Sequence, residues 1–205
     1  MWAYAFIRAR PSATITNMSI YRWFQIIVLA VSGLGATAPV YAENPRVAVT
    51  TEFGTFEIEL LEKLSPRTVS NFLQLVEDEF YDGLVFHRVI ANFMVQGGGY
   101  TADLKYKPGP NKVPNESFNG VKNTRGTVAM ARLSDPDSAD TQFFINVGDN
   151  PHLDADGNQA GYAVFGRISS GMEVVQRIEL VNTSLRQGMA AVPDTAVVIV
   201  TIRRI

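Results

Sequence analysis

The sequence predicts a mainly β protein, a closed eight-stranded antiparallel β-barrel whose open ends are covered by two α-helices. Two observations lead to this fold. Roughly eight short apolar or alternating runs, bounded by turn-forming residues, are typical of strands. Two further segments instead carry apolar residues at helical spacing. That combination suits a barrel capped by helices within a single domain.

The expected strands follow one another along the chain as Arg46–Thr51, Phe56–Leu60, Val85–Ile90, Phe93–Gly97, Val128–Ala131, Phe143–Asn146, Ala163–Ile168 and Ala196–Ile202. The first two form a hairpin that turns at Phe53-Gly54. The central pair bends at Ala91-Asn92, between its two alternating runs.

Two helices complete the predicted fold. Ser65 is the expected N-cap of the first helix, with Pro66 at its first position. Its apolar stripe recurs at Val69, Phe72, Leu73 and Val76. The second helix runs from Gly171 to Leu180. Residues 100–127 hold several prolines, asparagines and lysines and are predicted to form a long, solvated surface loop.

Residues 1–42 have the pattern of a secretory signal peptide, which predicts cleavage after Ala42 and a mature domain of residues 43–205. The segment contains three arginines and no acidic residue, followed by the apolar run Phe24–Leu34 and small residues up to Ala42. The run is short and broken by glycine, which argues against the alternative of a retained membrane anchor. Met18 offers an alternative start with a more usual leader.

Composition excludes several classes of function. The net charge of −2 gives no indication of a nucleic-acid partner. The absence of cysteine excludes disulfides, thiolate chemistry and cysteine zinc sites. The Asp154–Gly157 segment resembles the start of a calcium loop, but Gln159 and Phe165 occupy the positions where an EF-hand needs Gly and Glu. We therefore expect no metal, no cofactor and, after cleavage, no membrane contact.

The segment Phe86–Gly99 concentrates the candidate functional side chains. Strand alternation predicts that Phe86 and Arg88 share one face, as do Met94 and Gln96. An arginine among apolar neighbours needs an explanation, because burying an unpaired charge is costly. From this stretch alone, Arg88 either extends into solvent from the barrel rim or places its guanidinium at the mouth of an apolar pocket.

Four sequence blocks extend this observation: FHRVIANFMVQGGG at 86–99, GTVAMAR at 126–132, QFFIN at 142–146 and GYAVFG at 161–166. In this order they closely resemble the cyclophilin family of peptidyl-prolyl cis-trans isomerases, and the NTRGT and GYAVFG segments resemble bacterial periplasmic members. The resemblance covers essentially all of 46–202. It implies an eight-stranded barrel with two helices, action on proline-containing polypeptides, and a periplasmic role in folding exported proteins. We expect a monomer.

The resemblance also implies roles for individual residues. Arg88 matches the catalytic arginine of the family. The positions that match substrate-binding residues are Phe93, Met94, Phe144 and Leu153 in the proline pocket, Gln96, Gln142, the backbone of Ala131 and Arg132, Tyr162 and His152.

Three of these positions depart from the usual family pattern. Many members have Asn in place of Arg132, which a backbone role tolerates. Tyr162 replaces the pocket histidine of eukaryotic members, and its hydroxyl can still form a hydrogen bond. His152 replaces the tryptophan that contacts cyclosporin in sensitive members, so the expected binding of this drug is weak.

The implied reaction breaks no covalent bond, so no nucleophile–base pair is needed. Rotation about an X–Pro bond faces a barrier of roughly 18–20 kcal/mol because of the partial double bond. In the twisted transition state the proline nitrogen carries a localised lone pair. A rigid, permanently charged donor such as Arg88 would bind that state better than the planar amide.

Two alternatives use the same sequence differently. A non-catalytic proline-peptide-binding module or chaperone would need the groove but not the charge of Arg88 beside Gln96, so this pair favours the isomerase. A hydrolase could use Glu57 and Glu59, which share a strand face. No pocket signal accompanies these two carboxylates, and we interpret them as part of a solvated sheet edge.

Overall fold

The computed structural model describes residues 43–205, so the predicted signal peptide, its cleavage site and the alternative start at Met18 lie outside the described residues. The strands are β1 (Arg46–Thr51), β2 (Gly54–Leu60), β3 (Arg88–Ile90), β4 (Met94–Gly97), β5 (Thr127–Met130), β6 (Phe143–Asn146), β7 (Val164–Ser170), β8 (Thr183–Arg186), β9 (Met189–Pro193) and β10 (Ile199–Arg204). The α-helices are α1 (Pro66–Glu77) and α2 (Met172–Glu179). Within this part of the chain, no helix is long and apolar enough to cross a membrane.

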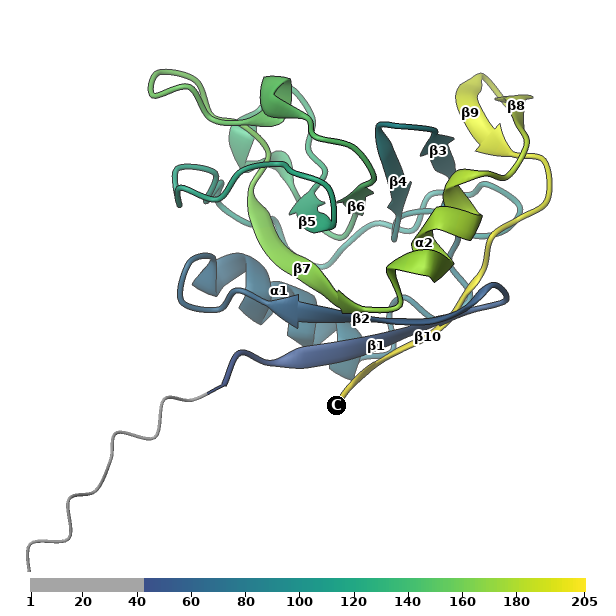
Figure 1. Ribbon diagram of the computed structural model, residues 1–205, viewed down its shortest axis with the longest axis horizontal. Helices are drawn as coiled ribbons and strands as arrows, with labels where there is room; N and C mark the ends of the chain where they lie inside the picture. The colour runs from purple at the N-terminus through teal and green to yellow at the C-terminus, as the bar shows by residue number, and fades with distance from the viewer. Residues whose placement is uncertain (1–42) are drawn as a thin grey trace, which may run out of the picture. The chain divides into compact units, whose positions relative to one another are not determined.

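Eight strands form one antiparallel, strongly curled sheet in the order β10-β1-β2-β7-β5-β6-β4-β3 (Figure 1). The end strands β3 and β10 do not pair directly. The segment that precedes β3 instead bonds to the start of β10 and to the residues just before it, with backbone hydrogen bonds from Gly83 N to Ile199 O (2.9 Å), from Ile199 N to Leu84 O (2.8 Å) and from Phe86 N to Val197 O (2.9 Å). The predicted eight-stranded fold with two helices is confirmed.

This closure explains why one prediction was wrong. Phe86 does not share a face with Arg88, because Phe86 precedes β3 and its backbone bonds to Val197 rather than to the strand that Arg88 pairs with. The Phe86 side chain is fully buried in the main core and packs edge-on against Phe143, with ring centroids 6.1 Å apart. Strand alternation predicts which side of the sheet a side chain occupies only as long as the strand keeps the same pairing partner.

The two helices bury apolar stripes against the sheet, which is why these amphipathic segments are stable as helices. Helix α1 lies against β10, and α2 lies against β2, β3 and β4 (Figure 1). The buried apolar residues are Val69, Phe72, Leu75 and Val76 of α1 and Val174, Val175 and Ile178 of α2. The predicted stripe of α1 is therefore correct except that Leu75, rather than Leu73, is fully buried.

The start of α1 is capped from a distant segment. Ser65 and Pro66 occupy the predicted positions, but the Ser65 hydroxyl does not cap the helix and donates to Val164 O (2.9 Å). The Glu116 carboxylate accepts hydrogen bonds from Arg67 N (3.1 Å), Thr68 N (2.9 Å) and the Thr68 hydroxyl (2.6 Å). A carboxylate satisfies free N–H groups and complements the helix dipole at this end.

Residues 100–127 are less solvated than the sequence predicts. The Glu116 cap holds the middle of this loop on α1. Val113, 4% exposed, forms a backbone bridge with Ala139, and Asn123 is buried as well. The polar composition of this loop led to the prediction that it is solvated. Its burial could not be predicted, because the partners of the buried groups are distant in the sequence.

The β8–β9 hairpin was not predicted from the sequence. Its turn residues Gln187 and Gly188 have φ of +48° and +78°, which suits a two-residue hairpin turn. Every residue of β8 is exposed, so the strand carries no apolar alternation that could mark it. The glycine at the turn was the available signal.

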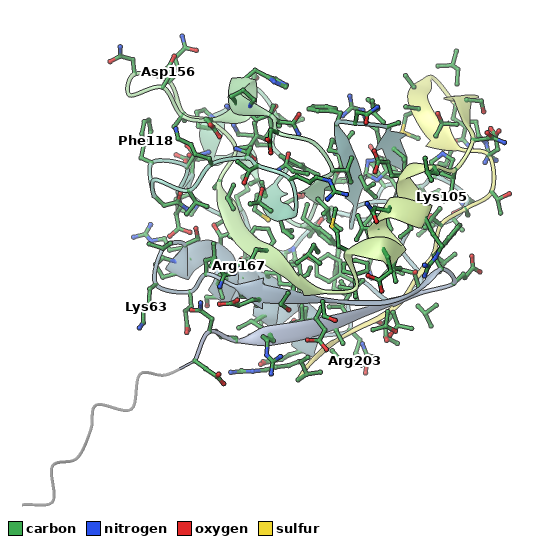
Figure 2. The ribbon with its side chains drawn as sticks, in the orientation of Figure 1. Lys63, Lys105, Phe118, Asp156, Arg167 and Arg203 are labelled. Atoms are coloured by element: carbon green, nitrogen blue, oxygen red, sulfur yellow. The ribbon has the colours of Figure 1, made fainter. Side chains whose placement is uncertain are left out.

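The carboxylates proposed for the alternative hydrolase lie on the outer surface of the sheet. Strand β2 is an interior strand between β1 and β7, so the predicted sheet edge is wrong. Arg167, which Figure 2 labels beside β7, donates from Nε to Glu59 at 2.9 Å, and Asn44 donates to the same carboxylate at 2.7 Å. The Asn44 hydrogen bond and the Arg167 contact lower the pKa of Glu59. Glu57 pairs with Arg46 at 3.4 Å.

Candidate active site

The candidate site lies on one row of residues that crosses four neighbouring strands. Arg88 of β3 is directly opposite Gln96 of β4, which is opposite Phe144 of β6, which is opposite Ala129 of β5. Side chains in such register lie close together on one face. The sheet therefore brings together residues from sequence blocks that are up to 56 positions apart.

These side chains surround a cavity of about 200 Å³. The cavity is lined by Arg88, Phe93, Met94, Gln96, Ala131, Arg132, Phe144, Leu153 and Tyr162, all of which the sequence predicted. The remaining predicted residues lie beside it. Gln142 accepts a hydrogen bond from Gln96 Nε2 (3.1 Å), and exposed His152 stacks on Phe93 with ring centroids 5.5 Å apart.

The cavity wall is an apolar cluster separate from the main core. Met94 and Phe144 are 2% and 3% exposed, and they pack with Ala129 and Val164. Phe93, Leu153 and Tyr162 complete the wall and are half-buried, so their apolar surfaces remain available to a ligand. Phe144 and Tyr162 meet edge-to-face with centroids 5.6 Å apart, a favourable aromatic geometry.

Arg88 supplies positive charge at this apolar surface. Its Nη1 donates to Gln96 Oε1 at 3.4 Å and lies 3.9 Å from the Met94 sulfur. Both partners are neutral. The guanidinium has five N–H donors, so donors remain for a ligand in the cavity.

The Arg132 side chain fixes the opposite rim. Its Nε, Nη2 and Nη1 donate to the carbonyls of Gly161 (3.1 Å), Ala160 (2.6 Å) and Leu133 (2.9 Å). The guanidinium also lies over the Tyr162 ring, 4.8 Å from its centroid. Because these contacts occupy the guanidinium, the backbone at 131–132 is better placed than the Arg132 side chain to contact a peptide.

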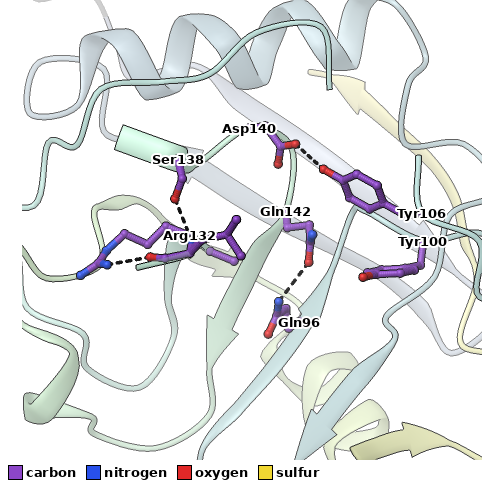
Figure 3. Close-up of a pocket in the computed structure, with 9 residues that line it drawn as sticks. Gln96, Tyr100, Tyr106, Arg132, Ser138, Asp140 and Gln142 are labelled. Carbon is purple, nitrogen blue, oxygen red and sulfur yellow. Dashed lines mark hydrogen bonds between the residues drawn. The ribbon is translucent and has the colours of Figure 1, made fainter. Parts of the chain in front are cut away.

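A second cavity of about 300 Å³ adjoins the first and shares Gln96, Ala131 and Arg132 with it. The other lining residues are Tyr100, Tyr106, Leu133, Ser138, Asp140 and Gln142. Figure 3 shows Gln96 pointing towards Gln142 and Tyr106 towards Asp140. Neither tyrosine was predicted as a site residue, because both lie at the start of the loop that was predicted to be solvated.

The Asp140 carboxylate lines this second cavity and accepts a hydrogen bond from another lining residue. The Tyr106 hydroxyl donates to Asp140 Oδ2 at 2.6 Å, and this bond raises the pKa of Tyr106 to about 12. Tyr106 therefore stays neutral over the physiological range. Among residues 43–205, no group of three or more His, Asp or Glu side chains is arranged to hold a metal ion.

His87 makes the stability of the fold depend on pH. The side chain is 5% exposed, packs against the Tyr100 ring with centroids 4.5 Å apart and the ring planes tilted by 48°, and has no hydrogen-bond partner for Nδ1 among the described residues. Burial lowers its pKa to about 4, with a smaller effect of Arg88 in the same direction and an opposing backbone contact with Val85. His87 is thus neutral when folded, as expected for a structural histidine rather than an acid–base group.

The low pKa of His87 predicts that the protein loses stability in acid. Below the unfolded pKa of about 6.5 the unfolded chain binds the proton first, so the free energy of unfolding falls as pH decreases towards 4. Relative to a His87→Phe variant, the wild type should lose roughly 3 kcal/mol between pH 7 and pH 4. Urea unfolding of both proteins at several pH values measures this, and parallel curves would contradict it.

Comparisons with known proteins define the class to which this fold and site belong. Residues 46–204 match the family described as cyclophilin type peptidyl-prolyl cis-trans isomerase/CLD. The chain belongs to this family, whose activity is the cis-trans isomerisation of X–Pro peptide bonds.

Bacterial relatives are similar over most of their length. A peptidyl-prolyl cis-trans isomerase of Acinetobacter baylyi is 45% identical over 177 residues, which cover 86% of this chain and 94% of the relative. Peptidyl-prolyl cis-trans isomerase A of Dickeya dadantii is 45% identical over 84% and 92% of the two chains. Peptidyl-prolyl cis-trans isomerase B of Escherichia coli K12 is 45% identical over 70% and 88%.

Solved structures show the same fold. A cyclophilin-type isomerase from Cryptosporidium parvum has a TM-score of 0.66 at 24% identity and covers 79% of this chain and 98% of its own. A second structure of that protein, obtained in the presence of the dipeptide Ala-Pro, has a TM-score of 0.64 at 25% identity and covers 77% and 97%.

Proposed function

We propose that the 200 Å³ cavity holds the proline ring of an X–Pro substrate and that Arg88 is the catalytic residue. The observation that carries this proposal is the guanidinium of Arg88, which has only neutral side-chain partners, beside a wall of Met94 and Phe144. The Ala-Pro dipeptide named with the Cryptosporidium parvum structure supports a proline-containing ligand. Turnover of an X–Pro peptide by the protein, followed by NMR exchange spectroscopy, tests the activity directly.

Catalysis follows from differential binding. As the X–Pro bond twists, amide resonance is lost and the lone pair localises on the proline nitrogen. An Arg88 N–H directed at that nitrogen stabilises the twisted state more than either planar isomer. The apolar wall excludes water, which strengthens this contact.

Two polar groups orient the rest of the peptide. Gln96 holds Arg88 from one side and donates to Gln142 on the other, so this amide pair positions the guanidinium and can bind the carbonyl next to the proline. Because the Arg132 side chain holds the opposite rim, the peptide backbone binds along residues 131–132. With one side of the bond held, only the other side rotates.

We further propose that the enzyme is exported, loses residues 1–42, and assists the folding of periplasmic proteins. The basic, apolar and small-residue order of this segment supports export. The Acinetobacter baylyi relative matches 86% of the chain, more than residues 43–205 make up, so the similarity continues into the leader. Slow X–Pro isomerisation limits the folding of many chains, which gives such an enzyme a substrate in any exported protein that contains proline.

Cell fractionation with mass spectrometry of the mature N-terminus tests export. Expressed in a Gram-negative bacterium, the protein should be recovered from the periplasm beginning at Glu43. A variant with Ala42→Arg is the control, because a bulky charged residue at the cleavage position blocks processing. Recovery of the uncleaved wild type from the cytoplasm would contradict the proposal.

A further inference from the structure

Three asparagine side chains lie buried beside the candidate site. Asn123, Asn146 and Asn150 are 1%, 0% and 4% exposed. A buried amide destabilises the fold unless its donors and acceptor are paired. In this protein the three amides pair mainly with one another and with two walls of the cavity.

Each of the three amides donates a hydrogen bond to the next side chain in a row that ends at Asp154. Asn150 Nδ2 donates to Asn146 Oδ1 (2.7 Å), Asn146 Nδ2 donates to Asn123 Oδ1 (3.2 Å), and Asn123 Nδ2 donates to Asp154 Oδ1 (3.1 Å). The Asp154 carboxylate only accepts, so it fixes the orientation of the Asn123 amide and, through it, of the other two. Lys122 Nζ lies 3.6 Å from the Asp154 carboxylate.

Each end of this row of hydrogen-bonded side chains contacts one wall of the cavity. At one end, Asn150 Nδ2 donates to the carbonyl of Phe93 (2.9 Å), which Val147 N also contacts (3.0 Å). At the other end, Asp154 directly follows Leu153, and Asn123 Nδ2 also lies 3.3 Å from the carbonyl of Tyr162. Tyr162 N in turn donates to Leu153 O (2.8 Å).

We propose that Asn123, Asn146 and Asn150 are positioning residues, forming a buried amide relay that sets the distance between the Phe93 wall and the Leu153–Tyr162 wall of the proline pocket. The inference rests on the proposed role of this cavity. Phe93 lies on the bend between β3 and β4, whereas Leu153 and Tyr162 both lie in the connection between β6 and β7, Leu153 at the end of the 3₁₀ helix Pro151–Leu153, so no β-ladder joins these walls directly. The relay connects the two walls through side chains, in addition to the short backbone segment that runs from Asn150 to Leu153.

The first test is Asn150→Ala, which removes the donor to the Phe93 carbonyl and leaves the ring itself intact. With the Phe93 carbonyl bonded only to Val147 N, the wall is held less firmly, and we expect KM for an X–Pro peptide to rise about tenfold with a smaller change in kcat. Asn119→Ala is the matched control, because Asn119 Nδ2 donates to Ser65 Oγ (2.7 Å) and Val164 O (2.9 Å) and Asn119 Oδ1 accepts from Val121 N (3.0 Å), but the amide makes no hydrogen bond to Phe93, Leu153 or Tyr162. It should lower thermal stability without raising KM.

Coupling between the ends of the relay is the second test. Asn123→Ala breaks the same chain at the other end, so the double variant with Asn150→Ala should raise KM no further than the more severe single variant does. Independent, multiplicative effects would mean that the two amides act separately, and the relay would be wrong.

A measurement on the wild type keeps the test decisive if a variant does not fold. In NMR spectra recorded with a saturating Ala-Pro-containing peptide, the side-chain amide signals of the three relay asparagines should shift more than that of Asn119. Equal, negligible shifts would overturn the inference.

Phe93→Ala separates this inference from the proposed function. If Phe93→Ala leaves KM unchanged, the cavity does not bind the proline ring and the proposed function fails. If Phe93→Ala raises KM but Asn150→Ala behaves like Asn119→Ala, only the relay is wrong.

Discussion

Replacing Arg88 with alanine is expected to lower kcat/KM for an X–Pro peptide by roughly 10²–10³-fold, the effect of removing one preorganised donor of about 2.7–4 kcal/mol. The fold should persist, because Arg88 is half-buried and its side-chain hydrogen bonds are the long contact with Gln96 and the weak one with Met94. NMR exchange spectroscopy measures the rate, and circular dichroism confirms folding.

Two further arginine variants make this result specific. Arg88→Lys keeps the charge but loses the rigid fork of donors, so its activity should fall between those of the wild type and Arg88→Ala. Arg167→Ala removes an exposed arginine whose partner is Glu59 on the outer sheet surface, and its activity should equal that of the wild type. Near-normal turnover by a folded Arg88→Ala variant would refute the catalytic role.

Replacing Phe144 with alanine should weaken substrate binding. The Phe144 ring forms part of the cavity wall, and the apolar contact of such a ring contributes about 1.5–3 kcal/mol, so kcat/KM should fall roughly 10- to 100-fold, mostly through KM. Steady-state kinetics with an X–Pro peptide measure both constants. A large fall in kcat with unchanged KM would contradict a binding role.

The neighbouring Phe143 provides a matched control, because successive residues of β6 face opposite sides of the sheet. Phe143 is fully buried in the main core against Phe72 and Tyr81, with centroids 5.6 Å from each. Phe143→Leu should therefore reduce stability while KM stays unchanged below the melting temperature. Phe144→Leu should raise KM with a similar loss of stability, so the pair separates binding from folding.

Local sequence determined the elements and the chemistry of the candidate site. Period-two runs fixed most strands because alternate side chains on a strand must face core or solvent. The four blocks that carry Arg88, Ala131, Phe144 and Tyr162 contain every residue that lines the 200 Å³ cavity except Leu153. Their family resemblance was decisive, since Phe93 or Phe144 alone would have fitted an ordinary core position equally well.

Long-range contacts decided the rest, because their partners carry no local signal. The Glu116 cap of α1 joins residues 48 and 49 positions apart, and the amide of Asn150 reaches Phe93 across 57 positions. A polar side chain in a loop has the same composition whether it is solvated or buried. Which asparagines are buried away from water, and must therefore pair with one another, depends on how the sheet closes. For the same reason, the sequence determined which side chains line the 200 Å³ cavity, whereas the tertiary structure determined which hydrogen bonds hold them.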